Sequence, residues 1–135
     1  MDLLPQSDGL LKWFLLYTSI SAAIHSVTTY VNPIPSMVPF QGPNAPPRSA
    51  LQAHLYGIKN CYTALIRMYA AYNLHKSREL YVLAMWTFAG VLFLYITELL
   101  LWQTVRLREA FIALVTAAAG LVWMWVQFDH YVPSG

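Results

Sequence analysis

Residues 80–97 have the sequence LYVLAMWTFAGVLFLYIT, a run of about 18 residues without a charged side chain. Residues 110–128, AFIALVTAAAGLVWMWVQF, and residues 13–47 also lack Asp, Glu, Lys and Arg. An α-helix rises about 1.5 Å per residue, so about 20 such residues cross a hydrocarbon core roughly 30 Å thick. A soluble chain of this size has no interior that could bury three helices apolar on every side. These runs therefore predict membrane-spanning helices.

The overall composition favours the same class of protein. The chain has 135 residues, of which 58% are hydrophobic and 10% charged, whereas soluble domains are about 25% charged. The net charge of +2, without a basic block, argues against nucleic acid as a partner. The single cysteine, Cys61, excludes an internal disulfide bond. The length indicates one domain over residues 1–135.

A proline-rich segment interrupts the helical pattern after the first apolar run. Asn32-Pro33 ends the first helix, because proline cannot continue one. Six of the eight prolines lie between Pro33 and Pro47. This composition predicts a loop over residues 32–49, called here the Pro-rich loop, that contains neither helix nor strand and lies at the membrane surface.

The remaining breaks in the pattern are two short polar turns near residues 76–79 and 106–109. Such short connections make the helices on either side antiparallel neighbours. We therefore predict an all-α membrane protein with four transmembrane helices in an up-down antiparallel bundle. The expected helices are residues 11–31, 50–73, 80–102 and 110–128.

The predicted helix 50–73 carries a polar stripe at membrane depth. At 100° per residue, one face about 100° wide collects Gln52, Tyr56, Lys59, Asn60, Thr63 and Arg67. A charge at mid-bilayer costs at least about 2.5 kcal/mol, so this face should contact protein or water. Two alternatives stay open: the helix lies flat in the interface, or the stripe is polar contact between helices. The helix length and the tight turn after it favour a spanning helix.

Side chains of other helices that lie at the same depth in the membrane are the candidates for contact with this stripe. If the helices 50–73 and 80–102 are antiparallel about their turn, Glu98 lies level with His54 and near Lys59, and His25 lies in the same leaflet. This predicts an intramembrane polar cluster of His25, His54, Lys59 and Glu98, since a lone buried carboxylate needs a basic partner. Arg67 belongs to the same polar face and lies level with Trp86, which predicts a cation–π contact there.

The polar cluster has a catalytic and a structural interpretation. A Glu with His54 or Lys59 could move protons in an intramembrane sterol-modifying enzyme such as a double-bond isomerase. Holding helices together is the more frequent role of paired intramembrane charges, and we favour it. The four histidines lie singly, without a His-box, and the glycines form no dinucleotide-binding turn. We therefore expect no catalytic residue, no cofactor and no metal.

Several short motifs, in order and over nearly the whole chain from Lys12, resemble the ergosterol biosynthetic protein 28 family, small membrane scaffolds of the endoplasmic reticulum. The matching motifs are Lys12-Trp13, Thr28-Thr29-Tyr30-Val31, Leu51-x-Ala53-x-x-Tyr56-Gly57, Ile66-Arg67, Trp86-Thr87-Phe88, Thr97-Glu98-Leu99-Leu100 and Leu121-Val122-Trp123-Met124. The family usually has Arg-Thr-Phe-Gly where this chain has His54-Leu55-Tyr56-Gly57, and a Trp where it has Lys59. A family Arg–Glu pair would here become His54 or Lys59 with Glu98.

This resemblance implies a non-enzymatic role in a multi-pass protein of the endoplasmic reticulum membrane. Such scaffolds tether the enzymes of sterol C-4 demethylation in ergosterol biosynthesis: the sterol C-4 methyl oxidase, the decarboxylating sterol dehydrogenase and the 3-keto reductase. Membrane lipid surrounds such a protein, and a sterol is a further candidate ligand. Self-association into a homodimer through helix faces is an additional expectation.

Overall fold

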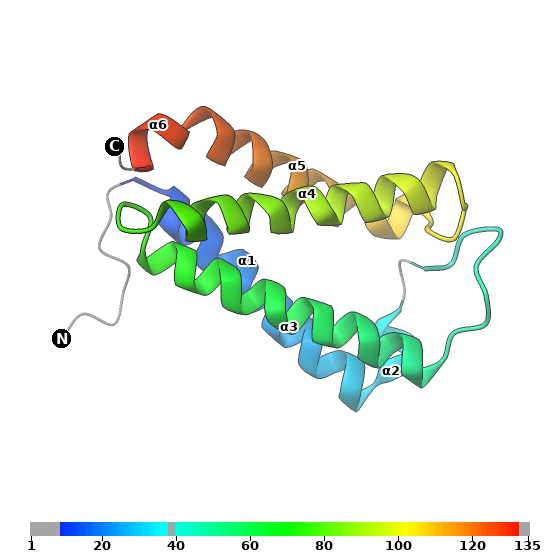
Figure 1. The fold of residues 1–135 in the computed structure, drawn as a ribbon. Coiled ribbons are helices and arrows are strands. Elements are labelled where there is room, and N and C mark those ends of the chain that lie inside the picture. Colours follow the sequence, from blue (N-terminus) through cyan, green and yellow to red (C-terminus); the bar gives the residue numbers. More distant parts are fainter. Residues whose placement is uncertain (1–8, 38–39, 133–135) are drawn as a thin grey trace.

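The structure is a computed structural model that describes residues 9–37 and 40–132, and in these residues every regular element is a helix. The predicted all-helical class is therefore confirmed. Figure 1 shows the elements, which are α1 (Leu11–Val31), α2 (Pro33–Ser36), α3 (Ala50–Tyr72), α4 (Arg78–Leu100), α5 (Leu107–Val126) and α6 (Phe128–Tyr131).

Serine side chains begin two of the long helices. Ser49 accepts a hydrogen bond from the backbone N–H of Gln52 at the start of α3, and Ser77 accepts one from Leu80 at the start of α4. Each satisfies an N–H group that has no partner in the first helical turn. These caps fix where the chain leaves the Pro-rich loop and the short α3–α4 turn.

The Pro-rich loop departs from the prediction at its start. Pro33–Ser36 forms the single-turn helix α2, so the expectation of no helix in this loop was wrong for these four residues. Proline suits the first turn of a helix, because its fixed φ is helical and its missing N–H would have no partner there. Residues 40–49 are neither helix nor strand.

The second half of the Pro-rich loop lies against the α4–α5 turn, residues 101–106. The N–H of Gly42 donates to the carbonyl of Thr104 at 2.9 Å, and the N–H of Asn44 donates to that of Gln103 at 2.9 Å. A Cβ at Gly42 would overlap the Gln103 carbonyl oxygen. Glycine is therefore required for this close approach of two backbones.

The four long helices form two pairs. Contacts are most extensive between α1 and α3, next between α4 and α5, and sparser between α3 and α4. The contact between α1 and α5 is the smallest among the long helices that touch. Figure 1 shows α1 beside α3 and α5 beside α4. The pairs are thus joined more loosely than the helices within each pair, in contrast to an evenly packed bundle.

Small side chains let α1 and α3 approach closely. Ser26 Oγ donates to the Gly57 carbonyl at 2.8 Å, and Ser19 Oγ donates to the Ala64 carbonyl at 2.7 Å. A Cβ at Gly57 would overlap the Oγ1 of Thr29. Both the donors and the acceptors are seven residues apart, so the contacts repeat every two helical turns. We call these five residues the serine seam.

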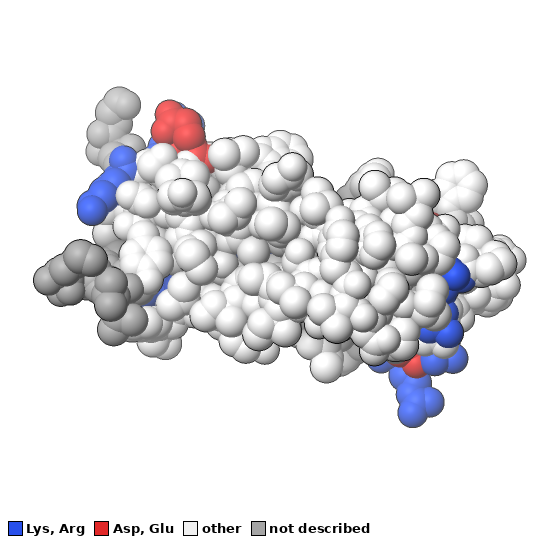
Figure 2. Space-filling model, turned by 90° about the horizontal axis from the view of Figure 1, so that it is seen from below, with Lys and Arg blue, Asp and Glu red and all other residues white. Residues whose placement is uncertain are grey.

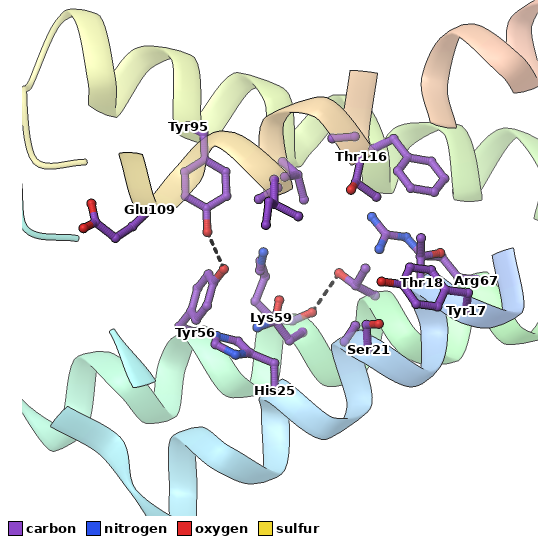
Figure 3. Close-up of a pocket in the computed structure, with 18 residues that line it drawn as sticks. Tyr17, Thr18, Ser21, His25, Tyr56, Lys59, Arg67, Tyr95, Glu109 and Thr116 are labelled. Carbon is purple, nitrogen blue, oxygen red and sulfur yellow. Dashed lines mark hydrogen bonds between the residues drawn. The ribbon is translucent and has the colours of Figure 1, made fainter. Parts of the chain in front are cut away.

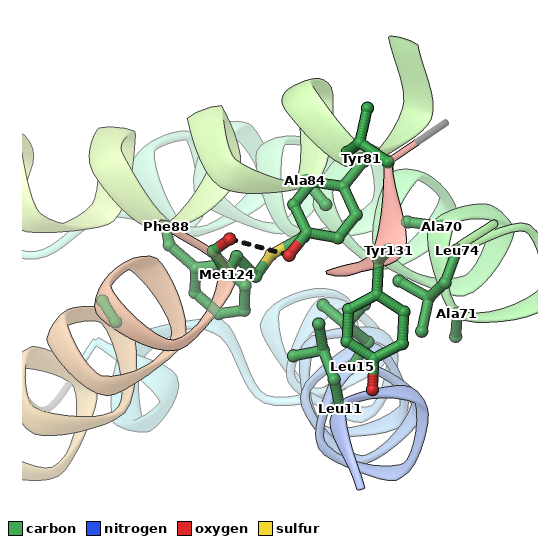
Figure 4. Close-up of a cluster of buried hydrophobic side chains, with 12 residues drawn as sticks. Leu11, Leu15, Ala70, Ala71, Leu74, Tyr81, Ala84, Phe88, Met124 and Tyr131 are labelled. Atoms are coloured by element: carbon green, nitrogen blue, oxygen red, sulfur yellow. Dashed lines mark hydrogen bonds between the residues drawn. The ribbon is translucent and has the colours of Figure 1, made fainter. Parts of the chain in front are cut away.

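Aromatic side chains fill the core at the end where the α3–α4 turn meets the carboxyl end of α5. Tyr81 is fully buried and donates to the Met124 carbonyl at 2.7 Å. Tyr131, 2% exposed, lies near it, and Phe88 continues the cluster toward the middle of the molecule (Figure 4). This cluster joins α4, α5 and α6 to the start of α1, represented by Leu15.

The outer surface is apolar between two charged ends. Among the described helices, α4 and α5 are long and apolar enough to cross a membrane, and only 22% of the most apolar window of each is buried. The core helix of a soluble protein would be mostly buried. Figure 2 shows charged atoms at both ends of the face that it draws, with an uncharged band between them.

Candidate functional site

A cavity of about 370 Å³ lies between the two helix pairs. All four long helices contribute to its wall, and Figure 3 shows Lys59 and Arg67 pointing into it while the Glu109 carboxylate points away. Its polar residues are Tyr17, Thr18, Ser21, His25, Tyr56, Lys59, Asn60, Thr63, Arg67, Tyr95, Glu109 and Thr116. Polar residues thus gather around a partly open space between the helix pairs, where Asn60, Thr63 and Arg67 are buried and Tyr17 is exposed.

Helix α3 supplies the polar stripe to this cavity. Five of the six residues predicted for the stripe line the cavity: Tyr56, Lys59, Asn60, Thr63 and Arg67. Gln52, one turn before Tyr56, lies instead in a neighbouring pocket beneath the Pro-rich loop. The apolar face of α3 is turned outward, with Leu55 63% exposed. The 3.6-residue period explains this division of the helix.

Two hydrogen bonds join α3 to α4 across the gap between the helix pairs. The hydroxyl groups of Tyr56 and Tyr95 lie 2.7 Å apart, and Arg67 Nε donates to Thr87 Oγ1 at 2.9 Å. The Phe40 ring, from the Pro-rich loop, lies against both tyrosine rings and covers this end. These bonds are close to the antiparallel register assumed from the sequence, in which Glu98 lies level with His54 and Arg67 with Trp86.

Arg67 and Lys59 are the two cations of the cavity. The Arg67 guanidinium lies 4.0 Å from the centre of the Phe88 ring, and only 7% of Arg67 is exposed. The predicted contact with Trp86 was wrong, since Trp86 points outward and is 68% exposed. The Lys59 ammonium lies 4.6 Å from the centre of the Tyr56 ring.

The two histidines of the predicted cluster occupy different places. His25 lines the cavity and presents an edge-to-face contact to Tyr56, with ring centres 5.3 Å apart. His54 stacks on Tyr30 of α1, with ring centres 4.2 Å apart and the planes 5° from parallel. The structure therefore brings His25 and Lys59 together, while His54 lies between α3 and α1.

Glu98 has a different direct partner from the two bases expected for it. Thr104 Oγ1, in the α4–α5 turn, donates to its Oε2 at 2.6 Å. No ion pair joins Glu98 to His54 or Lys59 in the described residues. Glu98 and Lys59 do line one further pocket, of about 400 Å³, below the Pro-rich loop. The carboxylate thus fastens the α4–α5 turn to the end of α4.

The contributions of α5 and of Tyr95 to the cavity were not predicted from the sequence. Glu109, at the rim of the cavity, forms an ion pair with Arg106, and Thr116 faces the interior. In the antiparallel register, the position that faces Tyr56 lies close to residue 95. A search for polar side chains around that position would have identified Tyr95. No comparable register links α5 to α3, because no turn joins them.

The cavity offers hydrogen-bond donors and positive charge. Lys59 and Arg67 are cations, and the surrounding hydroxyls can donate or accept. Within residues 9–37 and 40–132, no three His, Cys, Asp or Glu side chains come together as a potential metal site. The arrangement is suited to binding a polar or anionic group inside an apolar surround.

The fold and cavity define a small all-helical protein with two candidate membrane-spanning helices and a polar interior. The Erg28 like protein family matches residues 11–123, and the chain belongs to that family.

Three fungal relatives cover nearly the whole chain. Ergosterol biosynthetic protein 28 of Candida albicans is 32% identical over 134 residues, covering 97% of this chain and 95% of that protein. The protein of the same name from Saccharomyces cerevisiae is 28% identical, covering 91% and 83%. That from Gibberella zeae is 27% identical, covering 96% and 94%. No solved structure matches this chain.

Proposed function

We propose that this chain is a non-enzymatic scaffold of ergosterol biosynthesis in the endoplasmic reticulum membrane. It tethers the sterol C-4 methyl oxidase, the decarboxylating sterol dehydrogenase and the 3-keto reductase. The observation that carries the proposal is membership of the Erg28 family over residues 11–123, with relatives named for ergosterol biosynthesis that match along nearly their whole length. Tethering raises the effective concentration of each enzyme near the next, so an intermediate is captured before it diffuses away.

We further propose that α1 and α3 cross the bilayer together with α4 and α5. The 21 residues of α1 and 23 of α3 give lengths of about 32 and 35 Å, which match the hydrocarbon core. Both helices turn large apolar side chains outward, and α3 turns its polar face to the cavity. The exposed apolar residues of these two helices are Trp13, Tyr17, Ile20, Ile24, Val27, Tyr30, Val31, Leu51, Leu55, Ile58, Tyr62, Leu65, Met68, Tyr69 and Tyr72.

The contacts of the carboxylates support a structural role over catalysis. An isomerase of the alternative kind needs an acid or base that faces its substrate. Glu98 accepts a hydrogen bond from Thr104, and Glu109 pairs with Arg106, so both hold the α4–α5 turn region. In the described residues, Lys59 and His25 have no carboxylate within ion-pair distance. This separation counts against a Glu98–His54 or Glu98–Lys59 proton shuttle.

Cysteine labelling tests whether α3 spans the membrane or lies in its surface. In a Cys61→Ser background, single cysteines are placed at Pro46 and at Lys76, beyond the two ends of α3. A spanning α3 exposes them on opposite sides of sealed microsomes, so a membrane-impermeant maleimide labels only one before detergent is added. Labelling of both, or of neither, before detergent would show that α3 does not cross.

Co-purification tests the scaffold role. A tagged copy of the full chain is purified from fungal microsomes in mild detergent, and the bound proteins are identified by mass spectrometry. We expect enrichment of the three sterol C-4 enzymes over an equally abundant, unrelated multi-pass protein of the same membrane. Equal recovery from both baits would contradict the scaffold. Conversion of a sterol intermediate by the partner-free chain, abolished by Glu98→Gln, would establish the isomerase alternative instead.

A further inference from the structure

The cavity between the helix pairs holds two cations that lack an acidic partner. Lys59 and Arg67 project from the same face of α3 into this space (Figure 3). In the described residues, neither forms an ion pair with Asp or Glu. The side chains that contact them are neutral: the Tyr56 ring for Lys59, and Thr87 with the Phe88 ring for Arg67. In the described residues, the positive charges of Lys59 and Arg67 are therefore not paired with a carboxylate at ion-pair distance.

Such charge is costly inside a membrane protein unless an anion balances it. The two cations lie about two helical turns apart on the same face of α3. The acid that lines the cavity, Glu109, is at the rim and is paired with Arg106. The guanidinium has five N–H donors, and Thr87 takes the Nε–H. The remaining four donors of Arg67, with the Lys59 ammonium, are available to a ligand.

We infer that this cavity binds the anionic headgroup of a membrane lipid, phosphate or carboxylate, between Lys59 and Arg67. Guanidinium and ammonium groups are the side chains that hold these oxygen anions best. Hydroxyl-bearing residues, among them Thr63 and Thr116, line the same space and can bond the polar atoms next to the charge. This inference rests on the proposed membrane location and is independent of the tethered enzymes.

The cavity also has an exit for the lipid tail. Tyr17 of α1 and Ile112 of α5 both line it and are 65% and 78% exposed. They mark an opening between the two long helices that touch least. Apolar side chains such as Val91 and Ala113 continue the wall. An acyl or sterol body could therefore extend from the charged interior through this opening into the bilayer.

The position of the opening favours a lipid over an acidic helix from a partner protein. Tyr17 and Ile112, which mark the opening, belong to the exposed apolar surface of α1 and α5. In the proposed location membrane lipid covers that surface, whereas an acidic side chain of a partner would have to cross it to reach the cations.

Native mass spectrometry of the full chain in detergent micelles tests the inference, with dioleoyl phosphatidic acid, oleate and dioleoyl phosphatidylcholine as probes. We expect at least one anionic probe to bind at least tenfold more tightly than phosphatidylcholine. Preference for phosphatidic acid identifies a phosphate site, and preference for oleate identifies a carboxylate site. Equal binding of all three probes would overturn the inference, leaving a cavity filled by water.

Charge-removing variants locate the site. Lys59→Met and Arg67→Met should each weaken binding of the preferred anionic probe at least tenfold. The matched controls Lys76→Met and Arg108→Met change exposed residues at the two ends, and they should bind the probe as tightly as the natural chain does. Lys59→Arg keeps the charge and should keep the binding, which separates charge loss from misfolding. Equal weakening by interior and control variants, or no weakening by either interior variant, would overturn the assignment. Failure to recover the sterol enzymes by co-purification would contradict the scaffold role but would not affect the assignment of this lipid site.

Discussion

A methyl group added at Gly57 should separate α1 from α3. In the serine seam, the new Cβ of Gly57→Ala would overlap Thr29 Oγ1 and approach the Ser26 carbonyl oxygen to 3.2 Å. Thr29 is fully buried, and its hydroxyl donates to Ser26, so it has no open space to enter. The helices must move apart, which lengthens the serine hydrogen bonds to the carbonyls of Gly57 and Ala64.

The expected change in the free energy of unfolding for Gly57→Ala combines three contributions. Overpacking of a close contact costs about 1–3 kcal/mol. Two weakened hydrogen bonds between membrane helices cost about 0.6 kcal/mol each. Replacing glycine by alanine within a helix returns about 1 kcal/mol. The net destabilisation expected for Gly57→Ala is therefore about 1–3 kcal/mol. Gly90→Ala is the matched control, because nothing lies within 4 Å of a Cβ there, and it should stabilise α4 by up to about 1 kcal/mol.

The assay is reversible SDS unfolding of the purified chain in mild detergent micelles, followed by tryptophan fluorescence. A double-mutant cycle with Thr29→Ala sharpens it, because that change removes the atom that the new Cβ meets, and it should restore at least about 1 kcal/mol to Gly57→Ala. If Gly57→Ala matched Gly90→Ala in stability, or if the cycle showed no coupling, the close approach at the serine seam would be refuted.

Three further perturbations have defined outcomes. Tyr56→Phe and Tyr95→Phe should each lower the free energy of unfolding by about 0.6–1.7 kcal/mol, measured by SDS unfolding. The double variant should lose no more stability than either single variant, and additive losses would exclude the hydroxyl pair. Glu98→Leu and Thr104→Val should destabilise equally, by about 1–2 kcal/mol, whereas Glu98→Gln, which still accepts a hydrogen bond, should cost less in the same titration. Gly42→Ala should free the Pro-rich loop from the α4–α5 turn and speed its tryptic cleavage at least several-fold; an unchanged rate would refute the contact.

The all-helical class could be predicted because the charge-free runs and the proline boundary act locally. The same local rules explain why five stripe residues share one cavity, since helical periodicity alone fixes which side of α3 they occupy. The assumed register also placed Arg67 within one residue of its observed partner, Thr87.

The side-chain partners could not be predicted at this level. Trp86 and Phe88 are both within reach of Arg67 by depth, but they point to opposite sides of α4, and depth alone does not distinguish them. Glu98 accepts a hydrogen bond from Thr104 because the chain turns back directly after α4. This local hydrogen bond competes with any base on another helix. The separation of the helix pairs, which creates the cavity, depends on packing of side chains far apart in sequence.

The scaffold account is tested most directly by reconstitution. The sterol C-4 methyl oxidase and the decarboxylating sterol dehydrogenase are placed in liposomes at a low protein-to-lipid ratio, with and without this chain, and the lag before final product appears is measured. The account predicts that the chain shortens the lag severalfold, leaves the turnover of each separate enzyme unchanged and converts no sterol alone. An unchanged lag, or sterol conversion by the chain by itself, would contradict it.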